Sequence, residues 1–205
     1  MHQTEASLRY RLGLSLCHHD RCSAVRCDRI TKPHVAQHTG QGYLWRHPFS
    51  ADVQRRLVSA DNPSGSITNS DLEHAGLFGQ VDLMSTTHDT RYATIVNGSD
   101  NTPAVSRVRK GAVTSDGPAA YLCSWACQHQ RAHRYHHTSF YLPGEANIMA
   151  DDASHLQHLT DALFLSHFEQ RYPQPTPWKL LHLPPATATA LTSMLLCSSP
   201  SRQHR

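Results

Sequence analysis

The chain has 205 residues, of which 39% are hydrophobic and 17% are charged, and its formal net charge is +3 at pH 7. This length is sufficient for one domain with a buried core, and the low shares of apolar and charged residues predict that part of the chain is poorly ordered. The apolar runs are too short to cross a bilayer, which excludes a membrane-spanning protein. The chain has six cysteines and no secretory features, so the thiols are expected to stay reduced. We expect a soluble intracellular protein, in the cytoplasm or the nucleus, and the 17 histidines and local basic charge suit a polyanionic partner.

The first part of the chain shows no sustained hydrophobic period. Residues 1–33 are therefore predicted to form a weakly structured leader. Organisation is expected to begin near His34, with a strand over 40–46 and a second strand over 53–60. A cluster of turn-forming residues over 61–65 then leads the chain into a helix.

From residue 66 onwards, helical and strand patterns alternate. The helix over 71–85 has a broad apolar face, which is typical of a helix packed on a sheet. Strands are predicted over 92–97 and 138–142, and helices over 103–111, 118–137, 146–155 and 161–170. The order predicts a three-layer α/β or α+β domain over 34–160, followed over 161–205 by a helix, a proline-rich linker and a tail.

Three carboxylates stand where predicted elements begin or end. Glu73 lies in the first turn of the helix over 71–85, Asp100 follows the strand over 92–97, and Asp151 follows a Pro-Gly turn. Hard divalent cations prefer oxygen ligands of this kind. The three acids are therefore candidate metal ligands.

The same residues carry a resemblance to a known family. The segment 68–75, Thr-Asn-Ser-Asp-Leu-Glu-His-Ala, resembles the threonine-asparagine and helix-borne glutamate motif of ribonuclease H domains. Residues 99–101 are similar to the aspartate motif after that family's fourth strand, and residues 147–151 to its final asparagine, alanine, aspartate motif. The resemblance covers roughly 40–171 and is closest to the domains that lie beside a reverse transcriptase in retroelement polyproteins.

The resemblance implies a mixed five-stranded sheet flanked by helices. It also implies a hydrolase, an endonuclease that cuts the RNA strand of RNA/DNA hybrids with two Mg²⁺ or Mn²⁺ ions, and a reverse transcriptase domain as a partner. Glu73, Asp100 and Asp151 would be the catalytic residues and the metal ligands. Two such ions close together can activate water and stabilise the leaving oxygen.

The chain departs from the family pattern at the first strand. The family places its first aspartate ahead of a glycine that aligns with Gly42, and the corresponding position here is near Val35, which cannot bind Mg²⁺. We therefore expect impaired hydrolysis. The alternative is an inactive relic that retains the fold and binds nucleic acid.

Contacts with nucleic acid are predicted at Arg131 and Arg134 in the basic part of the helix over 118–137, and at Asn69 by the resemblance.

Three alternative roles apply to Glu73 and to two segments rich in cysteine and histidine. Glu73 stands three residues after Ser70, which is also capping-box spacing. The cysteines and histidines over 17–27 and over 123–137 suggest metal-binding modules, although the first set has unusual spacing and the second also fits a solvated helix side.

Overall fold

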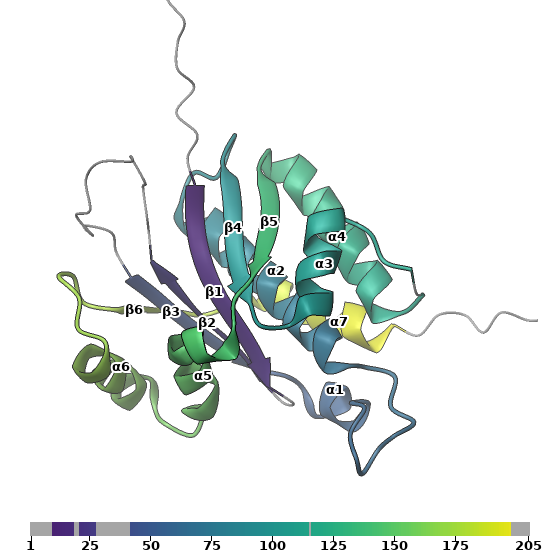
Figure 1. Cartoon of the computed structure of the whole chain (residues 1–205), viewed down its shortest axis with the longest axis horizontal. Coiled ribbons are helices and arrows are strands. Elements are labelled where there is room, and N and C mark those ends of the chain that lie inside the picture. The colour runs from purple at the N-terminus through teal and green to yellow at the C-terminus, as the bar shows by residue number, and fades with distance from the viewer. Residues whose placement is uncertain (1–9, 19–20, 28–41, 115, 198–205) are drawn as a thin grey trace, which may run out of the picture.

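The computed structural model describes residues 10–18, 21–27, 42–114 and 116–197. The described residues form one mixed sheet of six strands in the order β5-β4-β1-β2-β3-β6 (Figure 1). The strands are β1 (Tyr10–His18), β2 (Arg21–Cys27), β3 (Gly42–Pro48), β4 (Thr94–Ser99), β5 (His136–Tyr141) and β6 (Lys179–Leu181).

The sheet combines an antiparallel meander with parallel strands. Strands β1, β2 and β3 run antiparallel to one another, and β4 lies parallel to β1 on its other side. Strand β5 is parallel to β4, and β6 is parallel to β3 at the opposite edge. Within the register, Gly98 of β4 pairs with Leu14 of β1 and with Phe140 of β5. The carboxyl ends of β4 and β5 therefore lie at the same edge of the sheet.

Helices cover both faces of the sheet, with α2 and α7 behind it and α5 and α6 in front in Figure 1. Neighbouring residues of β3 show the same division, because Trp45 packs into a cluster with Phe78 of α2, whereas Leu44 packs with Phe164 and Phe168 of α6. The expected three-layer α/β or α+β architecture is therefore present. The helices are α1 (Ala51–Arg55), α2 (Asn69–Thr87), α3 (Thr102–Lys110), α4 (Pro118–His133), α5 (Ile148–His155), α6 (Asp161–Arg171) and α7 (Pro185–Leu196), with the 3₁₀ turn η1 (Gly144–Ala146).

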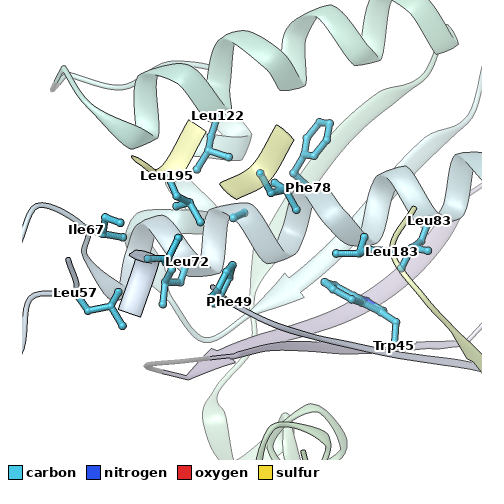
Figure 2. Close-up of a cluster of buried hydrophobic side chains, with 13 residues drawn as sticks. Trp45, Phe49, Leu57, Ile67, Leu72, Phe78, Leu83, Leu122, Leu183 and Leu195 are labelled. Carbon is cyan, nitrogen blue, oxygen red and sulfur yellow. The ribbon is translucent and has the colours of Figure 1, made fainter. Parts of the chain in front are cut away.

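Helix α2 is buried around most of its circumference, from Asp71 to Met84. It begins with a capping box, in which the Thr68 hydroxyl accepts from the Asp71 N–H and the Asp71 carboxylate accepts from the Thr68 N–H. Its outer side meets α7 and α4, as Figure 2 shows for Leu72 and Phe78 beside Leu195 and Leu122. Each such buried Leu or Phe stabilises the fold by roughly 1.5–3 kcal/mol relative to an exposed one.

The prediction of a weakly structured leader over 1–33 is wrong for the two strands that lie within it. β1 and β2 occupy the centre of the sheet. The sequence contains a short alternation in which Leu12, Leu14 and Leu16 are separated by Gly and Ser, which is the period of a strand. The first strand is therefore β1, and Val35, the position expected to correspond to the missing aspartate, lies outside the described residues.

Three further expectations need correction. The expected strand over 53–60 does not form. Residues 53–55 belong to the helix α1, whose amino end is capped by the Ser50 hydroxyl accepting from the Val53 N–H, and Leu57 makes only an isolated parallel bridge to Ile67. The sheet has six strands among the described residues rather than five, because β6 joins its edge. The expected linker up to Cys197 belongs to the fold, since Trp178 is buried and α7 packs on α4 and α2 through Leu191 and Leu195, whereas the expected tail over 198–205 lies outside the described residues.

The described part of the chain includes no helix that combines the length and the apolar character needed to cross a membrane.

Candidate active site

Glu73 is held at the point where α2 passes the end of β4. Its side chain is buried, and the Ser99 hydroxyl donates a hydrogen bond to the Glu73 Oε2 atom over 3.3 Å. Ser99 is the last residue of β4, so the contact joins positions 26 residues apart in the chain. The structure therefore places Glu73 directly beside the residue that precedes Asp100.

Asp100 follows the end of β4 and is partly buried. Burial raises the pKa of its carboxyl, and the nearby negative charge of Asp151 raises it further. The Asp100 Oδ2 atom lies only 3.5 Å from where a Cβ on Gly144 would be, so the loop before α5 passes close to this carboxylate. Asp151 is therefore close enough for its charge to act on Asp100.

Asp151 lies in the first turn of α5, and its side chain is half exposed. The Nδ1 atom of His155 lies 3.6 Å from the Asp151 Oδ1 atom and 2.9 Å from the Asp151 carbonyl oxygen. The neighbouring Asp152 is engaged elsewhere, because Arg171 Nε donates to its Oδ2 atom over 2.6 Å and the Tyr172 hydroxyl donates to the same oxygen. Between the two acids, Asp151 is the one whose charge acts on Asp100.

The amino end of α2 frames the site on one side. Asp71 caps the helix together with Thr68 and accepts a hydrogen bond from Arg107 Nη1 over 2.9 Å, which ties α2 to α3. The alternative role for Glu73 as the partner of Ser70 in a capping box is therefore wrong, because Thr68 and Asp71 form the box two residues earlier. Asn101, not Asp100, caps α3 by accepting from the Ala104 N–H.

The neighbouring strand β1 brings no acid to this site, since the sequence of Tyr10–His18 contains no Asp or Glu. Two dications side by side need ligand negative charge to offset their repulsion, and three carboxylates carry less charge than the ions. Among the residues whose positions are described, no group of three or more His, Cys, Asp or Glu side chains is arranged to hold a metal ion. The three carboxylates alone therefore supply less ligand charge than a pair of Mg²⁺ or Mn²⁺ ions needs.

The predicted nucleic-acid contacts fall at two separate places. Asn69 is the first residue of α2 and is exposed at the end of the sheet that carries the three acids. Arg131 and Arg134 are also exposed, but they lie where α4 ends and β5 begins. β5 runs parallel to β4, so the two arginines lie at the opposite end of the sheet from Asp100.

The cysteines and histidines of α4 and β5 separate into two groups. Cys123, Cys127 and His137 line a cavity of about 20 Å³ with His74 and Arg107. His129 instead packs against α2, where its Nε2 atom donates to the Asp82 Oδ1 atom over 3.0 Å, and its Nδ1 atom shares a hydrogen bond of 2.7 Å with the Tyr135 hydroxyl. The helix therefore does not present these groups as one metal-binding face. The alternative module over 17–27 depends on side chains outside those that the structure describes.

Two residues of the site were missed by sequence reasoning. Ser99 positions Glu73, and its place directly before Asp100 was the available signal. His155 lies four residues after Asp151 on α5, a spacing that brings helical side chains together.

Comparisons of the chain with protein-family models, with curated proteins and with solved structures find no significant match. What the chain does is therefore inferred from its own residues.

Proposed function

We propose that the chain is a ribonuclease H-like domain of retroelement origin that binds RNA/DNA hybrids and whose hydrolysis of the RNA strand is impaired. The observation that carries the proposal is the grouping of Glu73, Asp100 and Asp151. They come from α2, the end of β4 and α5, and they are linked through the Ser99 hydrogen bond and the Asp100–Asp151 coupling. Carboxylates gathered at a partly buried edge are the groups expected to act on a phosphodiester backbone through divalent ions.

The strand arrangement supports the same proposal. An antiparallel meander of three strands is followed by two parallel strands added beside the first, with α2 connecting the two parts. This arrangement is compatible with the sheet that the motif resemblance implies, with β6 as an additional edge strand. It also explains why acids from three distant segments meet at one edge.

Impairment follows from the ligand set. The strand beside β4 offers no carboxylate, so the site lacks the charge needed to hold two dications close together. The proposed site therefore has an incomplete set of donors.

The second candidate is a domain that binds nucleic acid without any hydrolysis. The absence of an acid in the sequence of β1 favours it, because that strand adjoins β4 along five paired positions from Tyr10 to Leu14. The reverse transcriptase partner implied by the resemblance fits either candidate.

A binding and cleavage assay with a labelled RNA/DNA hybrid tests the proposal and separates the two candidates. We expect binding to the hybrid, together with slow cleavage in Mg²⁺ or Mn²⁺ that Glu73→Gln abolishes. Asp152→Asn is the matched control, because Asp152 pairs with Arg171 away from the site, and its cleavage should equal that of the unmodified chain. Binding without cleavage would establish the second candidate, and a folded protein that does not bind hybrids would overturn both.

A further inference from the structure

Two residues other than glycine adopt positive φ among the described residues, and they are in contact with each other. Tyr92 has φ 57° in the loop before β4, and Arg134 has φ 54° at the end of α4. The Tyr92 N–H donates to the Arg134 carbonyl oxygen over 2.6 Å. The Arg134 Nη1 atom donates to the Tyr92 hydroxyl over 3.1 Å. Two strained loops are therefore joined at one point on the surface.

The backbone alone does not account for these two side chains. Left-handed backbone is unfavourable for residues with a Cβ and is free of this penalty for glycine. Glycine at either position would keep the backbone hydrogen bond between residues 92 and 134. Tyr92 is 80% exposed, so its ring contributes little to the core. What the pair adds to the molecule is an exposed aromatic ring beside a guanidinium group.

The surroundings of this pair are basic. Arg131 lies one helical turn before Arg134 and is exposed, as is His136 at the start of β5. Arg91 precedes Tyr92 and forms an exposed ion pair with Asp89, which is the one carboxylate in the sequence of the segments 86–93 and 130–137. We call Tyr92, Arg131 and Arg134 the tyrosine-arginine patch.

The patch is remote from the three acids. Tyr92 lies just before β4, and Asp100 lies just after it, so the six residues of the strand separate them by about 20 Å. A polynucleotide that touches the patch therefore makes a contact distinct from the one at Glu73, Asp100 and Asp151.

We propose that the tyrosine-arginine patch is a contact site for single-stranded nucleic acid. The Tyr92 ring stacks on a base, and the guanidinium groups of Arg134 and Arg131 pair with phosphates on either side of it. Stacking on an exposed aromatic ring is independent of base identity, and arginine contacts to phosphate are weakened by salt. The inference goes beyond the proposed function, because the contact requires neither the three acids nor a metal ion.

The test is fluorescence anisotropy of a short labelled single-stranded RNA with the full chain, in EDTA and over a range of salt concentrations. Tyr92→Gly is expected to weaken binding by about fivefold or more through the loss of stacking. Arg134→Gly is expected to weaken it and to reduce the slope of log affinity against log salt by about 0.7. Both glycine variants should keep or raise the melting temperature, because they remove backbone strain, so weaker binding in them is not caused by unfolding.

Two controls accompany the glycine variants. Tyr92→Phe keeps the ring and should bind like the unmodified chain. Arg109→Ala removes an equal charge from the exposed end of α3 and should leave the affinity nearly unchanged. Glycine variants that bind the single-stranded RNA as tightly as the unmodified chain would overturn the inference. An unmodified chain that does not bind the RNA, even if it binds an acidic protein, would overturn it as well. If the glycine variants still bind an RNA/DNA hybrid, the proposed function stands whatever the result with single strands.

Discussion

His74 and His137 are buried imidazoles on opposite walls of the cavity between α2, α4 and β5. Burial lowers the pKa of His74 to about 4, and the positive charge of Arg107 lowers it further, while the negative charge of Asp71 acts in the opposite direction. Burial also lowers the pKa of His137 to about 3, with His74 and His136 adding to the shift. Neither His74 Nδ1 nor His137 Nε2 has a hydrogen-bond partner among the described residues. Both rings are therefore held neutral.

These two histidines predict a loss of stability in mild acid. The unfolded chain binds protons at both positions near pH 6.5 and the folded chain only near pH 4 and below, so stability is fully present above 6.5 and falls as the pH drops. The expected slope is on the order of 1 kcal/mol per pH unit for each histidine. Urea unfolding between about pH 7.5 and pH 4.5 measures it. His74→Leu should reduce the slope, and an unchanged slope in that variant would contradict the assignment.

Gly111 offers a test of local backbone geometry. It ends α3 with φ 59°, and a Cβ built on it meets no atom within 4 Å. Gly111→Ala should therefore lower the free energy of unfolding by about 1 kcal/mol through backbone strain alone. Gly111→Asn should lower it less, because asparagine tolerates this conformation. Equal stability of the alanine variant and the unmodified chain, in thermal or urea unfolding, would show that the strain is absent.

Three residues, Glu73, Asp100 and Asp151, were selected from the sequence by their positions at element boundaries, and their role stays a prediction. In the structure, Glu73 accepts a hydrogen bond from Ser99, the residue before Asp100, and the charge of Asp151 acts on Asp100. Two contacts were not predictable, because they depend on distances between segments that are far apart in the chain. Ser99 donates to Glu73, and Arg171 pairs with Asp152 and so keeps this acid away from the proposed site.

At the scale of elements, a buried polar network holds α2, α4 and α7 together. Asp82 of α2 accepts from His129 of α4 and, over 2.6 Å, from the Thr187 hydroxyl of α7. Burial alone would raise the pKa of Asp82, but the hydrogen bonds from His129 and Thr187 hold it below its usual value. The carboxylate is therefore charged and shared by two helices that pack on α2.

Removing this carboxylate should loosen the packing of the three helices. Asp82→Ala leaves the partner groups on His129 and Thr187 without an acceptor, and we expect a loss of about 3 kcal/mol in the free energy of unfolding. Asp89→Ala, on the exposed surface after α2, is the matched control and should cost under about 1 kcal/mol. Urea unfolding of both variants measures the difference. Similar losses in the two variants would show that the network does not stabilise the packing.

Elements were predictable where their ends carry strong local features. The start of α3 at Pro103 and its end at Gly111 followed from helix capping preferences, and α2 followed from its polar start and apolar length. Strands β1 and β2 were missed because short alternations among arginines and histidines give a weak pattern, and the strands form through pairing with β3 and β4. Helix α7 was missed because its flanking prolines suggested a linker, whereas Pro184 and Pro185 start the helix.

For the whole molecule, the order of the strands places β1 beside β4, and β1 carries no carboxylate for the proposed site. Gly13 of β1 pairs with Asn97 of β4, whose amide donates to the Leu77 carbonyl oxygen of α2. Alternate positions of a strand share a face, so position 15 is level with Ser99 on the face of the sheet towards α2. Position 15 of β1 therefore follows the pair Leu14–Gly98 and is level with Ser99 of β4.

The most direct test of this account is to place an acid at that position and measure cleavage of a labelled RNA/DNA hybrid in Mg²⁺ and in Mn²⁺. The account predicts that Ser15→Asp cleaves at least about tenfold faster than the unmodified chain, since one added ligand charge completes the donor set. It also predicts that Glu73→Gln in the same background removes the gain and that Val35→Asp produces none. A folded Ser15→Asp variant that cleaves no faster than the unmodified chain, or a gain from Val35→Asp instead, would contradict the account.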